Sequence, residues 1–258
     1  MNDDIANKNY FISLSYKDES IFYESRSLLP NWITPNIFPA KDITPEEMIS
    51  DELLESIRQH DGLIYLSTEN SSNSVWVALE RDYAIRIKKP VYKLNPISKH
   101  FDRDLSQPME LKIFPSYTKK DKLVVETIIK LLRERHFDLF TDDLLQVEQN
   151  FAITINSEII SALDAGGYSV FFISKETMNS EWVKQELKAT IDKYSNRILP
   201  VIIDSSSITG VFAQYQALSL YDENCQDNIN RNKLDHLIVL LYWHIYQNTR
   251  FDMTQTKN

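Results

Sequence analysis

Glycine is scarce in this chain of 258 residues, which contains only Gly62, Gly166, Gly167 and Gly210. A dinucleotide-binding fingerprint needs three glycines within six positions, and a phosphate-binding P-loop needs two glycines followed by a lysine. Neither motif can be formed from these four residues. The sequence therefore excludes nucleotide binding through either of these two devices.

Several other features are missing. Cys225 is the single cysteine, so an intramolecular disulfide and a Cys-x-x-Cys motif are excluded. The five histidines are scattered, and we expect no metal site. The amino terminus lacks the basic start and apolar run of a signal peptide. The longest apolar stretch, Leu237–Trp243, is far shorter than the ~20 residues that span a bilayer. We therefore expect a cytoplasmic protein that does not contact a membrane.

The balance of charged residues also bears on whether the protein binds nucleic acid. The chain has 28 basic and 37 acidic residues, a formal net charge of −9, so a broad electropositive surface for nucleic acid is not expected. Hydrophobic residues make up 43% and charged residues 25%, which is typical of a soluble globular protein. The length allows one large domain or two of ordinary size.

The sequence contains an internal repeat of two similar copies. An apolar segment ends in Ser15-Tyr16, and another ends in Ser116-Tyr117. A segment with lysine and aspartate follows each, reaching Asp18 in the first copy and Asp121 in the second. Helical spacing of apolar residues comes next. In the second copy these residues are Val124, Ile128, Leu131 and Leu132.

Each copy then continues in the same order. A second strand is expected at residues 36–38 and 137–140, and a second helix at 49–57 and 155–163. Short apolar runs typical of buried strands follow at 62–67 and 169–174. This alternation predicts an open, mostly parallel sheet with helices on both faces in each copy. Aspartates that we interpret as loop residues follow the second strands: Asp42, Asp142 and Asp143.

Each buried run leads to the pattern Ser-x-Trp-x-x-x-Glu. The first instance joins Ser74, Trp76 and Glu80, and the second joins Ser180, Trp182 and Glu186. Serine is a favoured N-cap, so each serine predicts a helix start. The tryptophan then lies in the first turn, with the glutamate one turn further on the same face.

The domain boundary is expected between residues 106 and 107. The stretch 95–108, with Pro96 and Pro108, reads as a linker that closes the first domain. The second domain, 107–258, is expected to end in a helix that the first domain lacks. The apolar stripe that predicts this helix consists of Leu234, Leu237, Ile238, Leu241 and Ile245.

These segments resemble the Toll/interleukin-1 receptor (TIR) domain family. The marks are an apolar strand ending in Ser-Tyr, an aspartate-containing loop before a helix, and the Ser-x-Trp-x-x-x-Glu pattern. They occur twice and in the same order. In the first copy, residues 11–16 and 76–84 look especially like bacterial members. The resemblance implies two flavodoxin-like, TIR-type domains in tandem, covering nearly the whole chain.

The resemblance also implies an activity. Many bacterial and plant TIR domains cleave the nicotinamide–ribose bond of NAD⁺, by hydrolysis or by cyclisation to an ADP-ribose signal, and several bacterial relatives act in antiphage defence. The transition state is an oxocarbenium-like ribose that a nearby carboxylate stabilises. Glu80 and Glu186 are the catalytic candidates, and Glu80 is expected at least as readily as Glu186. The candidates for binding NAD⁺ are Ser15, Tyr16, Trp76, Ser116, Tyr117 and Trp182.

Other interpretations of the same residues stay open. A tryptophan in the first turn of a helix is usually a core residue, and a glutamate one turn later usually pairs on the surface with a base such as Arg81 or Lys184. The chain would then be a non-catalytic scaffold or adaptor that acts by TIR–TIR assembly. A third interpretation is an enzyme like the nucleoside deoxyribosyltransferases, which also use a glutamate on a doubly wound sheet.

The partners follow from the leading hypothesis. NAD⁺ is expected as the substrate, with no other cofactor. We expect a homo-oligomer or another TIR–TIR assembly, and a separate sensor or effector protein, because two TIR-like domains account for the chain. Nucleic acid and membranes are not expected as partners.

Overall fold

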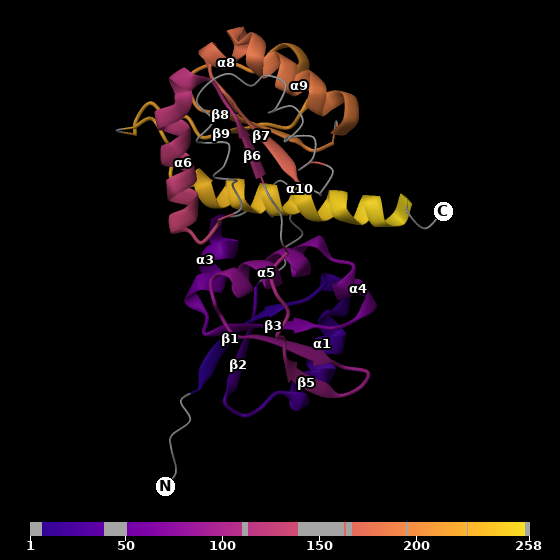
Figure 1. Ribbon diagram of the computed structural model, residues 1–258. Coiled ribbons are helices and arrows are strands. Elements are labelled where there is room, and N and C mark those ends of the chain that lie inside the picture. The colour runs from indigo at the N-terminus through magenta and orange to yellow at the C-terminus, as the bar shows by residue number, and fades with distance from the viewer. Residues whose placement is uncertain are drawn as a thin grey trace. The chain divides into compact units, whose positions relative to one another are not determined.

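The computed structural model describes residues 7–38, 51–109, 113–138, 163, 167–194, 196–225 and 227–255. The chain divides into two compact units, a first unit of residues 1–109 and a second unit of residues 110–258, three residues beyond the boundary that the sequence indicates. Each unit contains its own sheet (Figure 1). The expected loop residues Asp42, Asp142 and Asp143, and most of the expected elements at 137–140 and 155–163, lie outside the described residues.

The sheet of the first unit has the strand order β2-β1-β3-β4-β5. Its strands are β1 (Lys8–Ser13), β2 (Ile33–Ile37), β3 (Gly62–Leu66), β4 (Val91–Asn95) and β5 (His100–Arg103). The pairs β1–β2, β1–β3 and β3–β4 are parallel, as expected, and β4–β5 is antiparallel. The strand expected at residues 36–38 begins earlier, because its pairing with β1 starts at Ile33 opposite Lys8.

Helices cover both faces of this sheet, because successive side chains of a strand point to opposite faces. Tyr10 and Ile12 share a core with Phe22 of α1 (Glu19–Ser25). On the opposite face, α5 (Val75–Arg86) packs on β1, β3 and β4 and contacts α3 (Asp51–Gln59). The expected apolar residues of α3 within the described range are buried: Leu53, Leu54 and Ile57.

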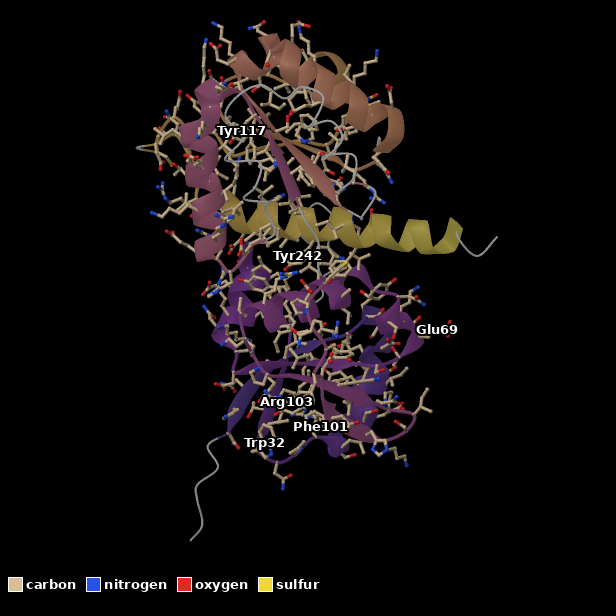
Figure 2. All side chains as sticks on the ribbon, viewed as in Figure 1. Trp32, Glu69, Phe101, Arg103, Tyr117 and Tyr242 are labelled. Carbon is tan, nitrogen blue, oxygen red and sulfur yellow. The ribbon has the colours of Figure 1, made fainter. Side chains whose placement is uncertain are left out.

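Residues 95–108 are not a linker, which corrects the sequence interpretation. β5 pairs with β4 along its whole length, and the rings of Tyr92 and Phe101 stack with their centroids 5.0 Å apart. Figure 2 shows Phe101 and Arg103 within the first unit, near Trp32. An edge strand with exposed side chains carries no apolar alternation, so its composition resembles that of a loop.

The segment after β5 is also held on the first unit. Arg81 Nε donates to Asp104 Oδ2 at 2.6 Å. Asp82, which is 1% exposed, accepts the backbone N–H of Met109 at 2.6 Å and pairs with Arg86 at 2.8 Å. Through these contacts α5, the helix that carries Glu80, anchors the chain up to the boundary between the units.

Gly62 provides a test of the packing around β3. A Cβ at this position would meet Cε1 of Tyr10 and lie 2.6 Å from the carbonyl oxygen of Pro90, a backbone atom that cannot move aside cheaply. We expect Gly62→Ala to lower the free energy of unfolding by about 2 kcal/mol, as overpacking of a tight core does. Thermal unfolding measures this loss, with the exposed turn variant Ser98→Ala as the control. Equal midpoints for Gly62→Ala and the wild type would contradict the packing.

The sheet of the second unit has the described order β6-β7-β8-β9, and all its pairs are parallel. Its strands are β6 (Ile113–Ser116), β7 (Tyr168–Ile173), β8 (Ile198–Ile202) and β9 (Leu218–Ser219). Pro115 lies on β6, which is one of the two outer strands among these four described strands. A proline is tolerated there because its missing N–H can face away from the paired neighbour.

The helices of the second unit include α6 (Lys122–Glu134), α8 (Lys175–Asn179), α9 (Glu181–Tyr194) and α10 (Lys233–Gln255). The expected terminal helix is confirmed by α10. All five residues of its predicted stripe are buried: Leu234, Leu237, Ile238, Leu241 and Ile245. Among the helices that the structure describes, none is both long enough and apolar enough to cross a membrane.

Candidate functional site

Glu80 lies on α5 and reaches the carboxyl end of β1. The Ser13 hydroxyl donates to Glu80 Oε2 at 2.5 Å. Ser74 caps the helix as predicted, because its hydroxyl accepts the N–H of Val77. This local cap sets where α5 begins, and the helical period then places Glu80 on the face that meets β1.

The environment of Glu80 favours its neutral form. Burial raises the pKa of this carboxyl to about 8, while the hydrogen bond from Ser13 acts in the opposite direction. The residue is only half-buried, so part of it stays accessible to solvent. Arg81, its neighbour in sequence, pairs with Asp104, and no ion pair joins Glu80 to any residue that the structure describes. An acid with a strongly raised pKa and residual access to solvent is a functional-site candidate.

Glu186 occupies the corresponding place in the second unit but is more enclosed. The Ser116 hydroxyl donates to Glu186 Oε2, and the residue is 6% exposed. Ser180 caps α9 as predicted, since it accepts the N–H of Val183 at 3.3 Å. Lys184 is bonded to Glu181 at 2.6 Å. Each candidate glutamate therefore accepts a hydrogen bond from a serine of its own unit, and the two glutamates differ in their exposure to solvent.

A buried aspartate follows β1. Asp18 is fully buried and accepts hydrogen bonds from the hydroxyls of Thr68 and Ser71 and from the Asn70 amide. Burial alone would raise its pKa, but these hydrogen bonds outweigh it and hold the pKa below the ordinary value. The aspartate thus fixes the start of the short helix α4 (Glu69–Ser72) against the end of β1.

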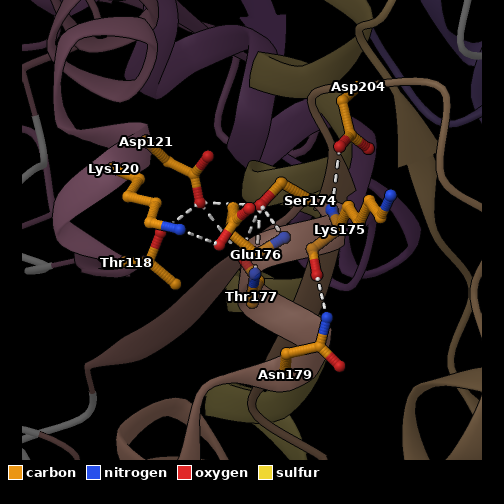
Figure 3. Close-up of polar contacts among 9 residues, drawn as sticks. All are labelled: Thr118, Lys120, Asp121, Ser174, Lys175, Glu176, Thr177, Asn179 and Asp204. Atoms are coloured by element: carbon orange, nitrogen blue, oxygen red, sulfur yellow. Dashed lines mark hydrogen bonds and ion pairs between the residues drawn. The ribbon is translucent and has the colours of Figure 1, made fainter.

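Asp121 makes the matching network after β6 (Figure 3). Its Oδ2 accepts from Ser174 at 2.7 Å, from Thr177 at 3.2 Å and from Thr118 at 2.5 Å. Ser174 is the N-cap of α8 and accepts the N–H groups of Glu176 and Thr177. The aspartate therefore fixes the start of α8 against the end of β6, as Asp18 does for α4.

The spacing of these contacts is the same in both units apart from one constant offset. Ser13 and Glu80 are 67 residues apart, and Ser116 and Glu186 are 70 apart. The contact between Asp18 and Thr68 spans 50 residues, and that between Asp121 and Ser174 spans 53. The same three-residue difference separates the contact of Asp18 with Ser71 from that of Asp121 with Thr177.

This spacing corrects the register that the sequence suggested within the repeat. Ser116 corresponds to Ser13 and not to Ser15. β1 ends at Ser13, so Ser15 lies beyond the strand as the N-cap of a 3₁₀ turn, Tyr16–Asp18, as Thr118 does before Lys119–Asp121. The pairing of Ser15-Tyr16 with Ser116-Tyr117 was therefore wrong, because a repeated Ser-Tyr dipeptide does not reveal where the strand ends.

The remaining candidates are placed differently. Tyr16 is 70% exposed. Tyr117 is half-buried, and its pKa is raised by burial and by the negative charges of Glu126 and Glu186. Trp76 is half-buried in the first turn of α5. Trp182 is in the first turn of α9, but its side chain lies outside the described residues.

Sequence reasoning missed Ser13 and the hydroxyl partners of the two aspartates. A signal was present, because Thr68, Ser71 and Ser74 recur at the same spacing as Ser174, Thr177 and Ser180. The contacts of Thr68 and Ser71 with Asp18, and of Ser174 and Thr177 with Asp121, join residues 50 to 56 positions apart, which spacing alone does not specify. Within the described ranges, no group of three His, Cys, Asp or Glu residues is arranged to hold a metal ion.

Fold and site define an α/β protein with parallel-rich sheets, in which a helical glutamate meets the end of the first strand. Residues 113–238 match the family model described as TIR domain, so a TIR domain is present within the second unit. The chain is also similar to a Cytobacillus dafuensis protein named "Putative cyclic ADP-D-ribose synthase TIR2", with 29% identity over 93 residues. The match covers 33% of this chain. It covers about a quarter (24%) of the length of that relative.

Proposed function

We propose that this protein cleaves the nicotinamide–ribose bond of NAD⁺ with Glu80 as the catalytic carboxylate. The single observation that carries the proposal is the Glu80 environment: a half-buried acid with a raised pKa, held by Ser13 at the carboxyl end of β1. Ligands of open α/β sheets bind beyond the carboxyl ends of the strands, where the strand order reverses. β1 lies at such a reversal, between β2 and β3.

The first unit is, in this proposal, a second TIR-type domain. The family model covers the second unit only, so the support comes from the matched polar contacts. The Ser–Glu bond and the aspartate network occur in both units with a constant three-residue offset. Contacts between distant residues recur in this way when two segments share one fold.

The chemistry needs one carboxylate. Nicotinamide leaves as a neutral molecule, so it needs no proton, while the ribose gains positive charge in the transition state. An ionised Glu80 stabilises that charge and orients the ribose hydroxyls. The positive nicotinamide ring of bound NAD⁺ favours ionisation of Glu80, because a nearby opposite charge lowers the pKa of an acid.

The substrate contacts are assigned by position. The start of α5 offers backbone N–H groups to a phosphate without requiring glycine. Trp76 in its first turn, and Ser15 and Tyr16 just beyond β1, are proposed to contact the nucleotide. Ser116, Tyr117 and Trp182 are the corresponding proposals for the second unit.

A structural role is favoured for the second unit. Glu186 is 6% exposed, which leaves little of it accessible to a substrate. This observation supports the scaffold function as a second candidate, with the second unit engaged in TIR–TIR assembly. Antiphage defence, with a separate sensor or effector as partner, is the proposed biological setting.

Incubation of the purified protein with NAD⁺, followed by chromatography with mass detection, tests the proposal. Nicotinamide release is expected, and the mass of the co-product distinguishes hydrolysis from cyclisation. Because assembly can be required, the protein is assayed at increasing concentration and with a crowding agent. Absence of nicotinamide under all these conditions would reject the enzyme in favour of the scaffold, and competition by deoxynucleosides would favour the deoxyribosyltransferase interpretation.

A further inference from the structure

A serine at the end of the first strand meets the candidate glutamate in both units. Ser13 is 1% exposed and donates to Glu80 Oε2 at 2.5 Å. Ser116 is 6% exposed and donates to Glu186 Oε2. Each serine is the last residue of its strand, and each glutamate lies six residues after the capping serine of its helix.

We propose that Ser13 is a positioning residue that orients the Glu80 carboxyl group and stabilises its ionised form against the opposing effect of burial. The part of this inference that concerns catalysis rests on the proposed function, and the part that concerns the carboxyl group does not. Ser13 holds its place because β1 is paired on both sides, with β2 and with β3, and Ser13 itself lies opposite Tyr65.

The physical reason is the opposition of two effects. Burial disfavours a charged carboxylate, whereas a hydrogen bond donated to the carboxylate favours it. Both act on Glu80: burial raises its pKa, and the Ser13 hydrogen bond lowers it. Without Ser13, burial would act unopposed and Glu80 would ionise only at a higher pH.

Other charged groups do not replace Ser13 in this role. On α5, Arg81 is paired with Asp104, and Asp82 with Arg86. Asp18, which follows β1, is bonded to the side chains of α4 and its cap. The remaining titratable groups on elements packed against α5 include Arg58, bonded to the Tyr83 hydroxyl, together with Tyr65, Tyr92 and Lys93. Two effects therefore act on the pKa of Glu80: burial raises it, and the hydrogen bond from Ser13 lowers it.

The test is a carboxyl titration that needs no enzyme activity. Protein with ¹³C-labelled glutamate carboxyl groups is titrated by NMR, and Glu80→Gln identifies the Glu80 resonance. Ser13→Ala is expected to raise the Glu80 pKa by about 1, the effect of losing a hydrogen bond to a charged group. Ser13→Thr keeps the hydroxyl and should restore a titration near that of the wild type.

Ser116→Ala is the matched control, because it removes the same bond in the other unit and should leave the Glu80 titration unchanged. If Ser13→Ala folds normally but leaves the Glu80 pKa unchanged, the inference is overturned. A merely structural role would lower stability without moving the titration. If Ser13→Ala does not fold, the titration of Ser13→Thr decides. A Glu80 pKa higher in Ser13→Thr than in the wild type, although the hydroxyl is retained, would also overturn the inference.

Activity then separates this inference from the proposed function. If the protein releases nicotinamide, the pH dependence of kcat/KM should move upward with Ser13→Ala, because that profile reports the free enzyme. A titration that moves in a protein that never releases nicotinamide would support the inference and reject the enzyme. If Ser13→Ala leaves the Glu80 pKa unchanged in a protein that does release nicotinamide, the proposed function is supported and the inference about Ser13 is rejected.

Discussion

Glu80→Gln is expected to lower kcat for nicotinamide release by roughly a hundredfold to a thousandfold, which is the usual cost of losing one electrostatic stabiliser of a transition state. Glutamine has nearly the same shape and can still accept the Ser13 hydrogen bond, so the change removes the charge and little else. KM should change far less than kcat, because the charge acts mainly in the transition state.

Two glutamates serve as controls for this variant. Glu69→Gln makes the same chemical change on the exposed surface of α4 in the same unit, where Figure 2 shows Glu69, and should leave the rate unchanged. Glu186→Gln changes the residue inside the range of the TIR family model. We expect a smaller loss there, because Glu186 is 6% exposed. A loss confined to Glu186→Gln would contradict Glu80 as the catalytic residue.

Glu80→Gln is also expected to make the first unit more stable than the wild type at alkaline pH. The pKa of Glu80 is raised from 4.5 to about 8 by burial, so the folded protein holds a proton that the unfolded chain releases. Wild-type stability therefore falls as the pH rises between about 4.5 and 8, and levels off above that range. This shift corresponds to at most about 5 kcal/mol, and we expect about 2 kcal/mol because Glu80 is partly solvated.

Hydrogen–deuterium exchange of the β1 and α5 peptides, measured at a series of pH values, follows the first unit by itself. The difference in protection between Glu80→Gln and the wild type should be small at pH 5 and largest at pH 8 and above, after correction for the intrinsic exchange rate. Glu69→Gln should show no such trend. A difference that stays constant with pH would mean that Glu80 is already ionised in the folded protein near neutral pH.

Features that depend on neighbouring residues could be predicted from the sequence. Ser74 and Ser180 were identified as N-caps, because capping involves residues only three positions apart. The stripe from Leu234 to Ile245 predicted α10, since helical period and burial are both visible along a continuous segment. The antiparallel strand β5 was missed, because its place at a sheet edge leaves no apolar pattern.

The sequence alone thus predicted the alternation of strands and helices in the described residues, apart from β5, together with the two units and the pair of glutamates that could carry the chemistry. Tertiary structure alone decided which serine meets each glutamate, because the end of a strand is set by pairing with neighbours distant in the chain. Tertiary structure also decided which hydroxyl groups donate to Asp18 and Asp121. Most of these hydroxyl groups belong to residues more than 50 positions away in the sequence. The difference in exposure between Glu80 and Glu186 arises from packing around each site, which two nearly identical motifs cannot encode.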